Sequence, residues 1–259
     1  MTQDKVNKIL GSEPPVALIV GASSGMGKEL ARQLVQEGYH VAVVARRQAL
    51  LDELVGELNE NREKPVAHAF VHDVTNYEEV PDLFERITNT MRGMDVIVFS
   101  AGIMPDIGSE DYDFASYRKI IDVNVLGAMA WLNQAAARFV HTGHGTIVGI
   151  SSVAGDRGRR GNPPYAASKA ALTTYLESLR NRLAPHGVHV VTVKPGPVHT
   201  PMTAHLPKLP LPIQADKAAQ LIAKAIAKQR GEVYVPGRWR PIMAIIRNIP
   251  SFIFRRMSF

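Results

Sequence analysis

The stretch VALIVGASSGMG, residues 16–27, decides the fold class of this 259-residue chain. Its first five residues are apolar and three of them are β-branched, which favours a buried strand. A turn of small residues follows, with glycine at positions 21, 25 and 27, and the apolar residues after it recur at helical spacing. A strand, a glycine-rich turn and a helix in this order are typical of the first unit of a dinucleotide-binding fold.

The glycine-rich turn predicts a phosphate site. Residues without large side chains let the backbone approach a pyrophosphate, and the N-terminus of the following helix stabilises its negative charge. The spacing is GxxxGxG and not GxGxxG, and such a turn alone can be a tight connection, but the strand and helix around it favour a nucleotide. The residues expected to contact the cofactor here are Gly21, Ser23, Ser24, Gly25, Met26 and Gly27.

Beyond this unit, short apolar runs alternate with segments of helical period, as in βαβ units. The runs are nearly continuous, which is expected when helices cover both faces of a parallel sheet. We therefore predict an α/β fold: a Rossmann-like, doubly wound, seven-stranded parallel sheet with helices on both faces, in a single domain over residues 1–259. The predicted strands are Val16–Val20, His40–Ala45, Val66–Val71, Val96–Ser100, Thr146–Ile150, His189–Lys194 and Glu232–Val235.

The amino-acid composition excludes several kinds of site and binding partner. The chain has no cysteine, which excludes disulfides, thiolate metal sites and a cysteine nucleophile. His141 and His144 have HxxH spacing but no nearby third ligand, so no metal site is predicted. The sequence has no signal-like or membrane-spanning apolar stretch, so we expect a cytoplasmic protein. The net charge of +6 is concentrated after Glu232, where five arginines and no acids follow, and nucleic-acid binding is therefore not expected.

The residues at the end of the second strand predict the choice of cofactor. An enzyme that binds the 2′-hydroxyl of NAD(H) places an acid there, whereas this chain has Ala45, Arg46 and Arg47. Guanidinium groups bind phosphate bidentately, so NADP(H) is preferred over NAD(H). The alternative is a pair of solvated surface arginines.

Tyr165 and Lys169 stand four residues apart at the start of a predicted helix, which Asn162 caps and Pro163 begins. The ammonium is expected to favour the phenolate and to bring the pKa of the tyrosine closer to neutral pH. Ser152 follows the fifth strand, where its hydroxyl can polarise a carbonyl. A tyrosine and a lysine at this spacing are more often a packing pair, but their convergence with the nucleotide turn and the serine on one sheet edge indicates a catalytic site.

The sequence resembles the short-chain dehydrogenase/reductase family, in its compact single-domain branch, from Val16 to about Val235. The family usually has Asn-Asn-Ala-Gly where this chain has Phe-Ser-Ala-Gly, which implies altered packing beneath the cofactor but not loss of binding. The matching motifs, in order, are GASSGMG at 21–27, Asp73 after the third strand, FSAG at 99–102, Asn124 in VNVLG, ISS at 150–152, YAASK at 165–169 and PGPVHT at 195–200.

The resemblance implies an oxidoreductase that moves a hydride between nicotinamide and a carbonyl or alcohol carbon. Tyr165 would be the general acid/base, and Ser152 would orient the carbonyl. Lys169 would contact the nicotinamide ribose and lower the pKa of the tyrosine, and Asn124 would hold a water in a proton relay ending at that lysine. A homodimer or homotetramer is expected. The further cofactor contacts, besides Tyr165 and Lys169, would be Asp73, Val74, Ser100, Ala101, Gly102, Pro195, Gly196, Val198 and Thr200.

Two C-terminal segments bear on the substrate, which is expected to be a ketone or aldehyde. The proline-rich stretch 195–212 predicts a lid-like loop, with His199 and His205 as candidates for specificity. The tail, residues 238–259, interleaves apolar residues with arginines, and Pro241 and Pro250 are expected to break it into short pieces. It either lies on an anionic membrane surface, which would suit an apolar or lipid-like substrate, or packs over the pocket or a subunit interface.

A function from another class is an alternative: an NADP(H)-binding regulatory protein that senses redox state without turnover. The same fold and cofactor site also serve epimerases and dehydratases, so the fold does not settle the reaction. The joint presence of Asn124, Ser152, Tyr165 and Lys169 favours the enzyme.

Overall fold

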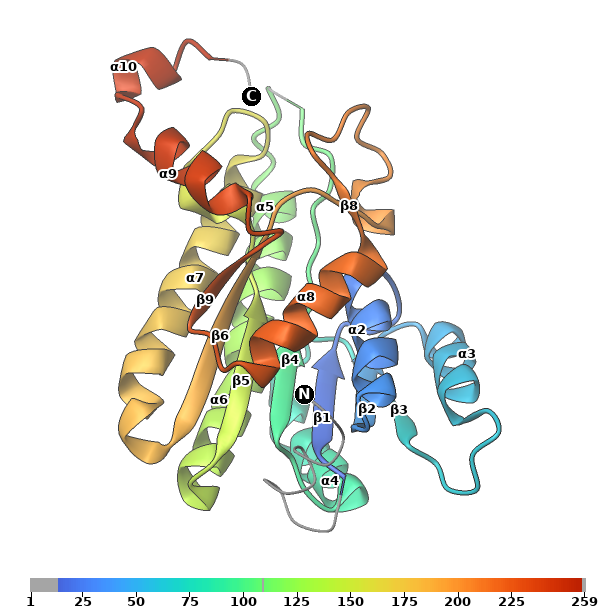
Figure 1. The fold of residues 1–259 in the computed structure, drawn as a ribbon. Coiled ribbons are helices and arrows are strands. Elements are labelled where there is room, and N and C mark those ends of the chain that lie inside the picture. Colours follow the sequence, from blue (N-terminus) through green and yellow to red (C-terminus); the bar gives the residue numbers. More distant parts are fainter. Residues whose placement is uncertain (1–13, 109, 258–259) are drawn as a thin grey trace.

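The structure is a computed structural model and describes residues 14–108 and 110–257. The described residues form a seven-stranded, all-parallel sheet in the order β3-β2-β1-β4-β5-β6-β9 (Figure 1). The order reverses at β1, which lies between β2 and β4, so a crevice for a ligand is expected at the carboxyl end of β1. The bounds are β1 Val16–Val20, β2 His40–Ala45, β3 Ala67–Val71, β4 Val96–Phe99, β5 Gly145–Ile150, β6 Val188–Pro195 and β9 Glu232–Val235.

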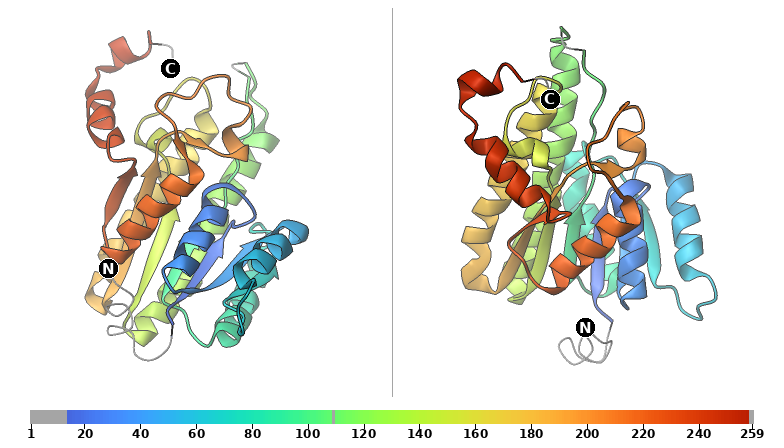
Figure 2. Two further views of the ribbon diagram at one scale, coloured as in Figure 1. Left: turned by 45° about the vertical axis from the view of Figure 1, so that its right-hand side comes forward. Right: turned by 45° about the horizontal axis from the view of Figure 1, so that its top comes forward.

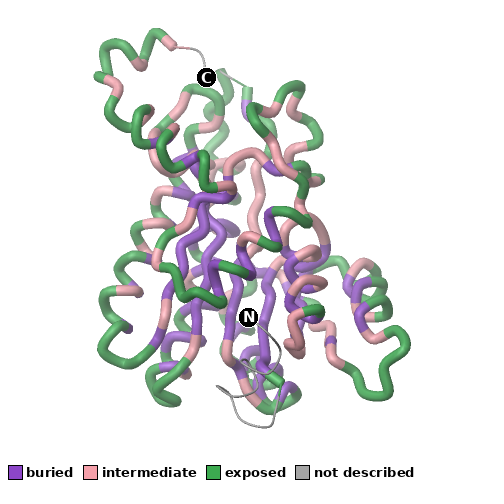
Figure 3. Tube along the Cα trace, in the orientation of Figure 1, coloured by how far each residue is buried: buried purple, intermediate pink, exposed green. Residues whose placement is uncertain are grey.

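Helices cover both faces of this sheet (Figures 1 and 2). Leu18 and Val20 of β1 join the core under α4, α6 and α7, whereas Ala17 and Ile19 join the core under α2, α3 and α8. Figure 3 shows the strands as the buried centre of the molecule. The predicted doubly wound architecture is confirmed. The helix bounds are α2 Gly25–Gln36, α3 Gln48–Asn59, α4 Val80–Met91, α5 Phe114–Ile121, α6 Gly127–Thr142, α7 Pro163–Leu183, α8 Ala215–Ala227, α9 Trp239–Asn248 and α10 Ser251–Phe254.

The proline-rich stretch is more regular at its start than predicted. β6 continues to Pro195, which lies in register with Val235, because a missing N–H at the last residue of a strand leaves the ladder before it intact. A short parallel pair then forms between β7 (Val198–His199) and β8 (Ile213–Gln214). The segment between them loops over the carboxyl edge of the sheet, at the upper end of the molecule in Figure 1.

The tail forms helices α9 and α10, and one expectation about it is wrong. Pro241 does not break α9, because it is the third residue of the helix, where the backbone N–H has no partner within the helix. Pro250 does separate α9 from α10. Trp239 and Met243 are buried against the body of the protein. Within residues 14–108 and 110–257, no helix is long and apolar enough to cross a bilayer.

Candidate active site

The glycine-rich turn brings backbone into contact with backbone at the end of β1. Gly21 has a φ of +94°, and a Cβ built there would lie 2.3 Å from the backbone nitrogen of Ala101. A Cβ at Gly27 would lie 2.3 Å from the carbonyl oxygen of Gly21. These positions require glycine for close packing. Because α2 begins at Gly25, its N-terminal N–H groups lie at this turn, which suits the phosphates of a dinucleotide.

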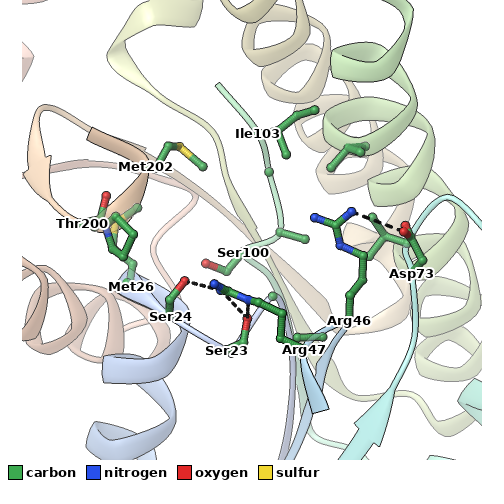
Figure 4. A pocket seen from close by; sticks show the side chains of 18 of the residues that line it. Ser23, Ser24, Met26, Arg46, Arg47, Asp73, Ser100, Ile103, Thr200 and Met202 are labelled. Carbon is green, nitrogen blue, oxygen red and sulfur yellow. Dashed lines mark hydrogen bonds and ion pairs between the residues drawn. The ribbon is translucent and has the colours of Figure 1, made fainter. Parts of the chain in front are cut away.

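A pocket opens beside this turn, and most of the predicted cofactor residues line it (Figure 4). Six lining residues were not predicted as cofactor contacts, although His72, Ile103 and Pro201 directly follow or precede predicted motifs. Extending each motif by one or two residues would have found them. The predicted residues in the lining are Gly21, Ser23, Ser24, Gly25, Met26, Arg46, Arg47, Asp73, Val74, Ser100, Ala101, Gly102 and Thr200, and the unpredicted ones are His72, Ile103, Val123, Pro201 and Met202, besides Ala45.

The two arginines after β2 both line the pocket but differ in their contacts. Arg47 donates from Nη2 to the hydroxyls of Ser23 and Ser24, at 2.8 Å each (Figure 4). Arg46 lies 3.4 Å from a carboxylate oxygen of Asp73, and 58% of its side chain is exposed. An exposed ion pair of this kind contributes little and rearranges at small cost. Both guanidinium groups therefore line the pocket without being held in a strong ion pair.

Asp73 is fixed by its own turn. Its Oδ1 accepts hydrogen bonds from the backbone N–H of Thr75 at 3.0 Å and from the Thr75 hydroxyl at 2.8 Å. Burial alone would raise the pKa of this carboxyl, but the bonds from Thr75 and the nearby Arg46 lower it. A carboxylate ready to accept a hydrogen bond thus lies at the pocket wall.

Several predicted cofactor residues lie outside the lining of this pocket. Gly27 packs against Gly21, as described above. A Cβ at Gly196 would lie 2.0 Å from the indole nitrogen of Trp239, so this glycine makes room for α9. Pro195 and Val198 are buried, Val198 within the core under α8. In this structure these positions make packing contacts within the protein, and their contact with a cofactor stays a prediction.

Tyr165 lies in the first turn of α7. Asn162 caps this helix, because its side-chain oxygen accepts the Tyr165 backbone N–H at 3.1 Å. The Asn162 amide also donates to the carbonyl of Pro105 at 2.9 Å, which ties the helix start to the loop after β4. Ser152 lies close enough to the tyrosine hydroxyl to influence its pKa. The predicted cap and the predicted convergence of serine and tyrosine are both present.

The pKa of Tyr165 shifts in the direction opposite to the expected one. Burial raises it, and the nearby Ser152 side chain opposes this only in part. The phenol therefore keeps its proton at neutral pH, which is the form that donates a proton to a carbonyl oxygen. Burial cannot be read from the spacing of tyrosine and lysine, so the sequence alone predicted the wrong sign.

Lys169 is buried, with only 4% of the residue exposed. Its ammonium donates to the carbonyl of Ile150 at 2.9 Å and lies 5.7 Å from the centre of the Tyr165 ring. Burial lowers its pKa to about 8. The backbone carbonyl of Lys169 accepts a hydrogen bond from the Ser151 hydroxyl at 2.9 Å, which holds this part of α7 against the end of β5.

Asn124 is completely buried in a π-helical turn, Asp122–Leu126, between α5 and α6. Its amide accepts from the Ile103 N–H at 2.8 Å and donates to the Ile103 carbonyl and the Ser168 hydroxyl, both at 3.0 Å. Single π-helical turns are frequent at functional sites because they re-aim a side chain within a helix.

Gly102 lies between the pocket and the side chains of Asn124 and Lys169. It lines the pocket, and a Cβ built on it would lie 3.3 Å from Oδ1 of Asn124 and 3.6 Å from Nζ of Lys169. The side chains of Asn124 and Lys169 therefore stand directly behind the pocket wall. Ser100, the departure from the family pattern, keeps the loop in place through its backbone, because its N–H and that of Ala101 donate to the Val20 carbonyl at 2.8 and 2.9 Å.

The histidines considered in the sequence lie elsewhere. His199 and His205 are exposed and outside the pocket lining. His144 lies 3.6 Å from Asp95, at the opposite edge of the sheet. The part of the chain that the structure describes contains no cluster of three or more His, Cys, Asp or Glu residues able to hold a metal ion.

Comparisons with known proteins agree with this geometry. Residues 15–209 match the sequence profile described as short chain dehydrogenase. An uncharacterized oxidoreductase of Myxococcus xanthus is 34% identical over 244 residues, which cover 92% of this chain and 94% of that protein. A short-chain type dehydrogenase/reductase from Mycobacterium marinum is similar in structure, with a TM-score of 0.79, 28% identity, and coverage of 87% of this chain and 95% of that one. An actinorhodin polyketide ketoreductase variant solved with NADPH has a TM-score of 0.77 and 26% identity, over 90% of this chain and 97% of that one.

Proposed function

This chain belongs to the short-chain dehydrogenase/reductase family of oxidoreductases, which act on CH–OH or C=O groups, and we propose that it is an NADP(H)-dependent carbonyl reductase. In the reverse direction the same site would oxidise an alcohol. The observation that carries the proposal is the placement of Tyr165 near Ser152 with the Lys169 ammonium 5.7 Å from the centre of the tyrosine ring, behind the wall of the pocket beside the glycine-rich turn.

The proposed chemistry divides the work among the catalytic side chains. Bound NADPH would supply the hydride for the carbonyl carbon. Tyr165 donates its hydroxyl proton to the carbonyl oxygen, which the Ser152 hydroxyl polarises. Ser152 accepts the Ala154 N–H at 3.0 Å, so its own proton is available to Tyr165 or substrate. The Lys169 ammonium stabilises the phenolate that remains, and Asn124 holds the loop at Ile103 that carries the pocket wall.

The preference for NADP(H) rests on Arg46 and Arg47. Both line the pocket, and neither is committed to a strong ion pair. A 2′-phosphate placed between them would accept charge-assisted hydrogen bonds, whereas no acid stands at the end of β2 to accept a ribose hydroxyl. The ketoreductase solved with NADPH supports this choice by analogy.

The direct test is turnover. Purified protein is assayed with NADPH against a panel of ketones and aldehydes that includes long-chain and lipid-linked carbonyls, by the loss of NADPH absorbance. We expect substrate-dependent oxidation of NADPH for at least one carbonyl class. A protein that binds NADPH tightly but turns over no member of the panel would instead support the redox-sensing alternative.

The exposed part of the tail is proposed to contact an anionic membrane. α9 is held to the protein through Trp239 and Met243, which agrees with the packing alternative for that helix. Ile245, Phe252 and Ile253 are nevertheless exposed among the arginines of α9 and α10. Apolar side chains flanked by arginines suit the headgroup region of an anionic bilayer.

Co-sedimentation with vesicles tests the membrane contact. The full chain should pellet with vesicles containing phosphatidylglycerol and remain in the supernatant with pure phosphatidylcholine. A chain ending at Pro250 keeps Trp239 and Met243 and should lose the binding. Equal binding by the full and shortened chains would contradict the proposal.

Members of this family are typically oligomeric, and a homodimer or homotetramer is proposed for this chain. Light scattering on the purified protein measures the assembly directly, and a monomer at micromolar concentration would contradict the proposal.

A further inference from the structure

A buried ion cluster lies behind Ser152, outside the pocket and outside the family motifs. Lys194, near the end of β6, places its ammonium 2.9 Å from Oδ1 of Asp156 and 2.7 Å from Oε2 of Glu232. The Tyr234 hydroxyl donates to the other oxygen of Asp156 at 2.8 Å. The side chains of Lys194 and Asp156 are only 4% and 3% exposed.

Burying such a pair is costly, and well-packed apolar residues would stabilise a fold as well or better. Burial opposes the charge on Lys194, but its bonds to Glu232 and Asp156 outweigh this and raise its pKa. The lysine therefore stays protonated at neutral pH. A protonated lysine held between two carboxylates fixes the positions of the groups around it through directional bonds, so the segment that carries Asp156 is held in place.

Asp156 ends the short 3₁₀ turn Val153–Asp156, which follows Ser152 directly. Within this turn the Ala154 N–H donates to the Ser152 hydroxyl at 3.0 Å. The turn also presses on the catalytic helix, since a Cβ at Gly155 would lie 2.6 Å from the backbone carbon of Lys169. The turn therefore packs against α7, and Asp156 at its end is bonded to residues of β6 and β9.

Helix α9, the first helix of the tail, packs against this turn from the side opposite α7. Val153 packs with Tyr234, Trp239 and Met243 in a small core of its own. Arg157, the residue after the turn, donates to the carbonyls of Ile246 at 2.5 Å and Arg247 at 3.2 Å in α9. The ion cluster, β9 and α9 therefore all converge on the segment that carries the Ser152 hydroxyl.

We propose that Lys194 and Asp156 are positioning residues, which hold the Ser152 hydroxyl against Tyr165 through the turn Val153–Asp156. The proposal rests on the proposed function for its kinetic consequences. Neither residue touches the reacting atoms. Their contribution is to the position of the Ser152 hydroxyl relative to Tyr165, on which carbonyl polarisation depends.

The principal variant is Asp156→Asn, which keeps the shape of the side chain and removes its charge. We expect kcat for carbonyl reduction to fall roughly 10- to 100-fold, while the Kd for NADPH changes by less than about twofold. Thr192→Val is the matched control, because Thr192 lies on β6 with Lys194 and accepts a hydrogen bond from Arg180 at 2.6 Å, away from the turn. Thr192→Val should lower Tm by about as much as Asp156→Asn does, and it should leave kcat unchanged. An equal loss of kcat in both variants would mean that the cluster only stabilises the fold.

A double-mutant cycle with Ser152→Ala tests the route of the effect. If Asp156 acts through Ser152, then Asp156→Asn in the Ser152→Ala background should lower kcat by less than about twofold. An undiminished loss in that background would overturn the proposal. Should Asp156→Asn fail to fold, Tyr234→Phe, which removes one hydrogen bond from the cluster, is subject to the same cycle and the same two outcomes.

A spectroscopic measurement separates this proposal from the proposed function. The protein is labelled with ¹³Cζ-tyrosine, and the Tyr165 signal is assigned by its loss in Tyr165→Phe. Asp156→Asn should move this signal toward its position in Ser152→Ala, and Thr192→Val should leave it in place. A shift without any turnover by the wild-type protein would support the positioning role and reject the reductase. An unmoved signal in Asp156→Asn would overturn the positioning role whether or not the protein is a reductase.

Discussion

The two halves of the site are built differently. On the nucleotide side, Arg46 is 58% exposed and weakly paired, and Arg47 rests on the hydroxyls of the glycine-rich turn. On the catalytic side, Lys169 and Asn124 are buried and bonded to backbone. A ligand must rearrange the two arginines of the nucleotide side, whereas Lys169 and Asn124 are in place before it binds. Under the proposed function, affinity and cofactor choice depend on adaptable charges, and chemistry depends on preorganised, desolvated groups.

Tyr165→Phe gives the largest expected effect and tests the catalytic half alone. Removing the proton donor should lower kcat by roughly 10²- to 10⁴-fold, while the Kd for NADPH stays within about twofold because the pocket lining is unchanged. Steady-state kinetics and a fluorescence titration with NADPH measure the two quantities. Full activity in this variant would remove Tyr165 from the mechanism.

Lys169→Met tests how strongly the catalytic half is desolvated. The pKa of Lys169 is lowered from 10.5 to about 8, so the unfolded chain binds more protons than the folded protein between these pH values. The lysine therefore destabilises the fold at low pH, and the free energy of unfolding rises across that window by about 3 kcal/mol. Denaturant unfolding of both proteins should show this rise in the wild type and not in Lys169→Met. Parallel curves would show that the lysine titrates normally.

Gly21→Ala tests the nucleotide half, where backbone contacts replace side chains. The new methyl group would meet the backbone of Ala101 at a positive φ, so the free energy of unfolding should fall by about 2 to 3 kcal/mol. Gly56→Ala in α3 is the control, because a Cβ there meets nothing within 4 Å, and it should add about 0.5 to 1 kcal/mol. Thermal unfolding with and without NADPH measures both, and similar changes in the two variants would contradict the close-contact account.

Arg46→Asp has the smallest expected effect and tests the adaptable charges. Losing a charged hydrogen bond to a 2′-phosphate should shift the ratio of kcat/KM for NADPH over NADH roughly 10- to 100-fold toward NADH. The shift should arise in KM and not in kcat. An unchanged ratio would assign the arginine to the solvated surface.

Much of the site could be predicted from local sequence patterns, because the glycine-rich turn and the Tyr165–Lys169 pair each encode their geometry within a few residues. The cluster of Lys194, Asp156 and Glu232 could not be predicted. Lys194 lies 38 positions from each of the two acids in the chain, and only the fold brings them together. For the same reason, the sequence could not show that Gly196 faces Trp239. The sign of the Tyr165 pKa shift was also out of reach, because it depends on burial.

Under the proposed function, cofactor binding and proton transfer are separated between the two halves of the site. The most direct test measures kcat for carbonyl reduction and the Kd for NADPH side by side in Tyr165→Phe and Arg46→Ala. The account predicts that the tyrosine variant loses kcat and keeps its Kd, and that the arginine variant weakens the Kd and keeps kcat. A tyrosine variant that retains kcat, or an arginine variant that loses kcat with its Kd unchanged, would contradict it.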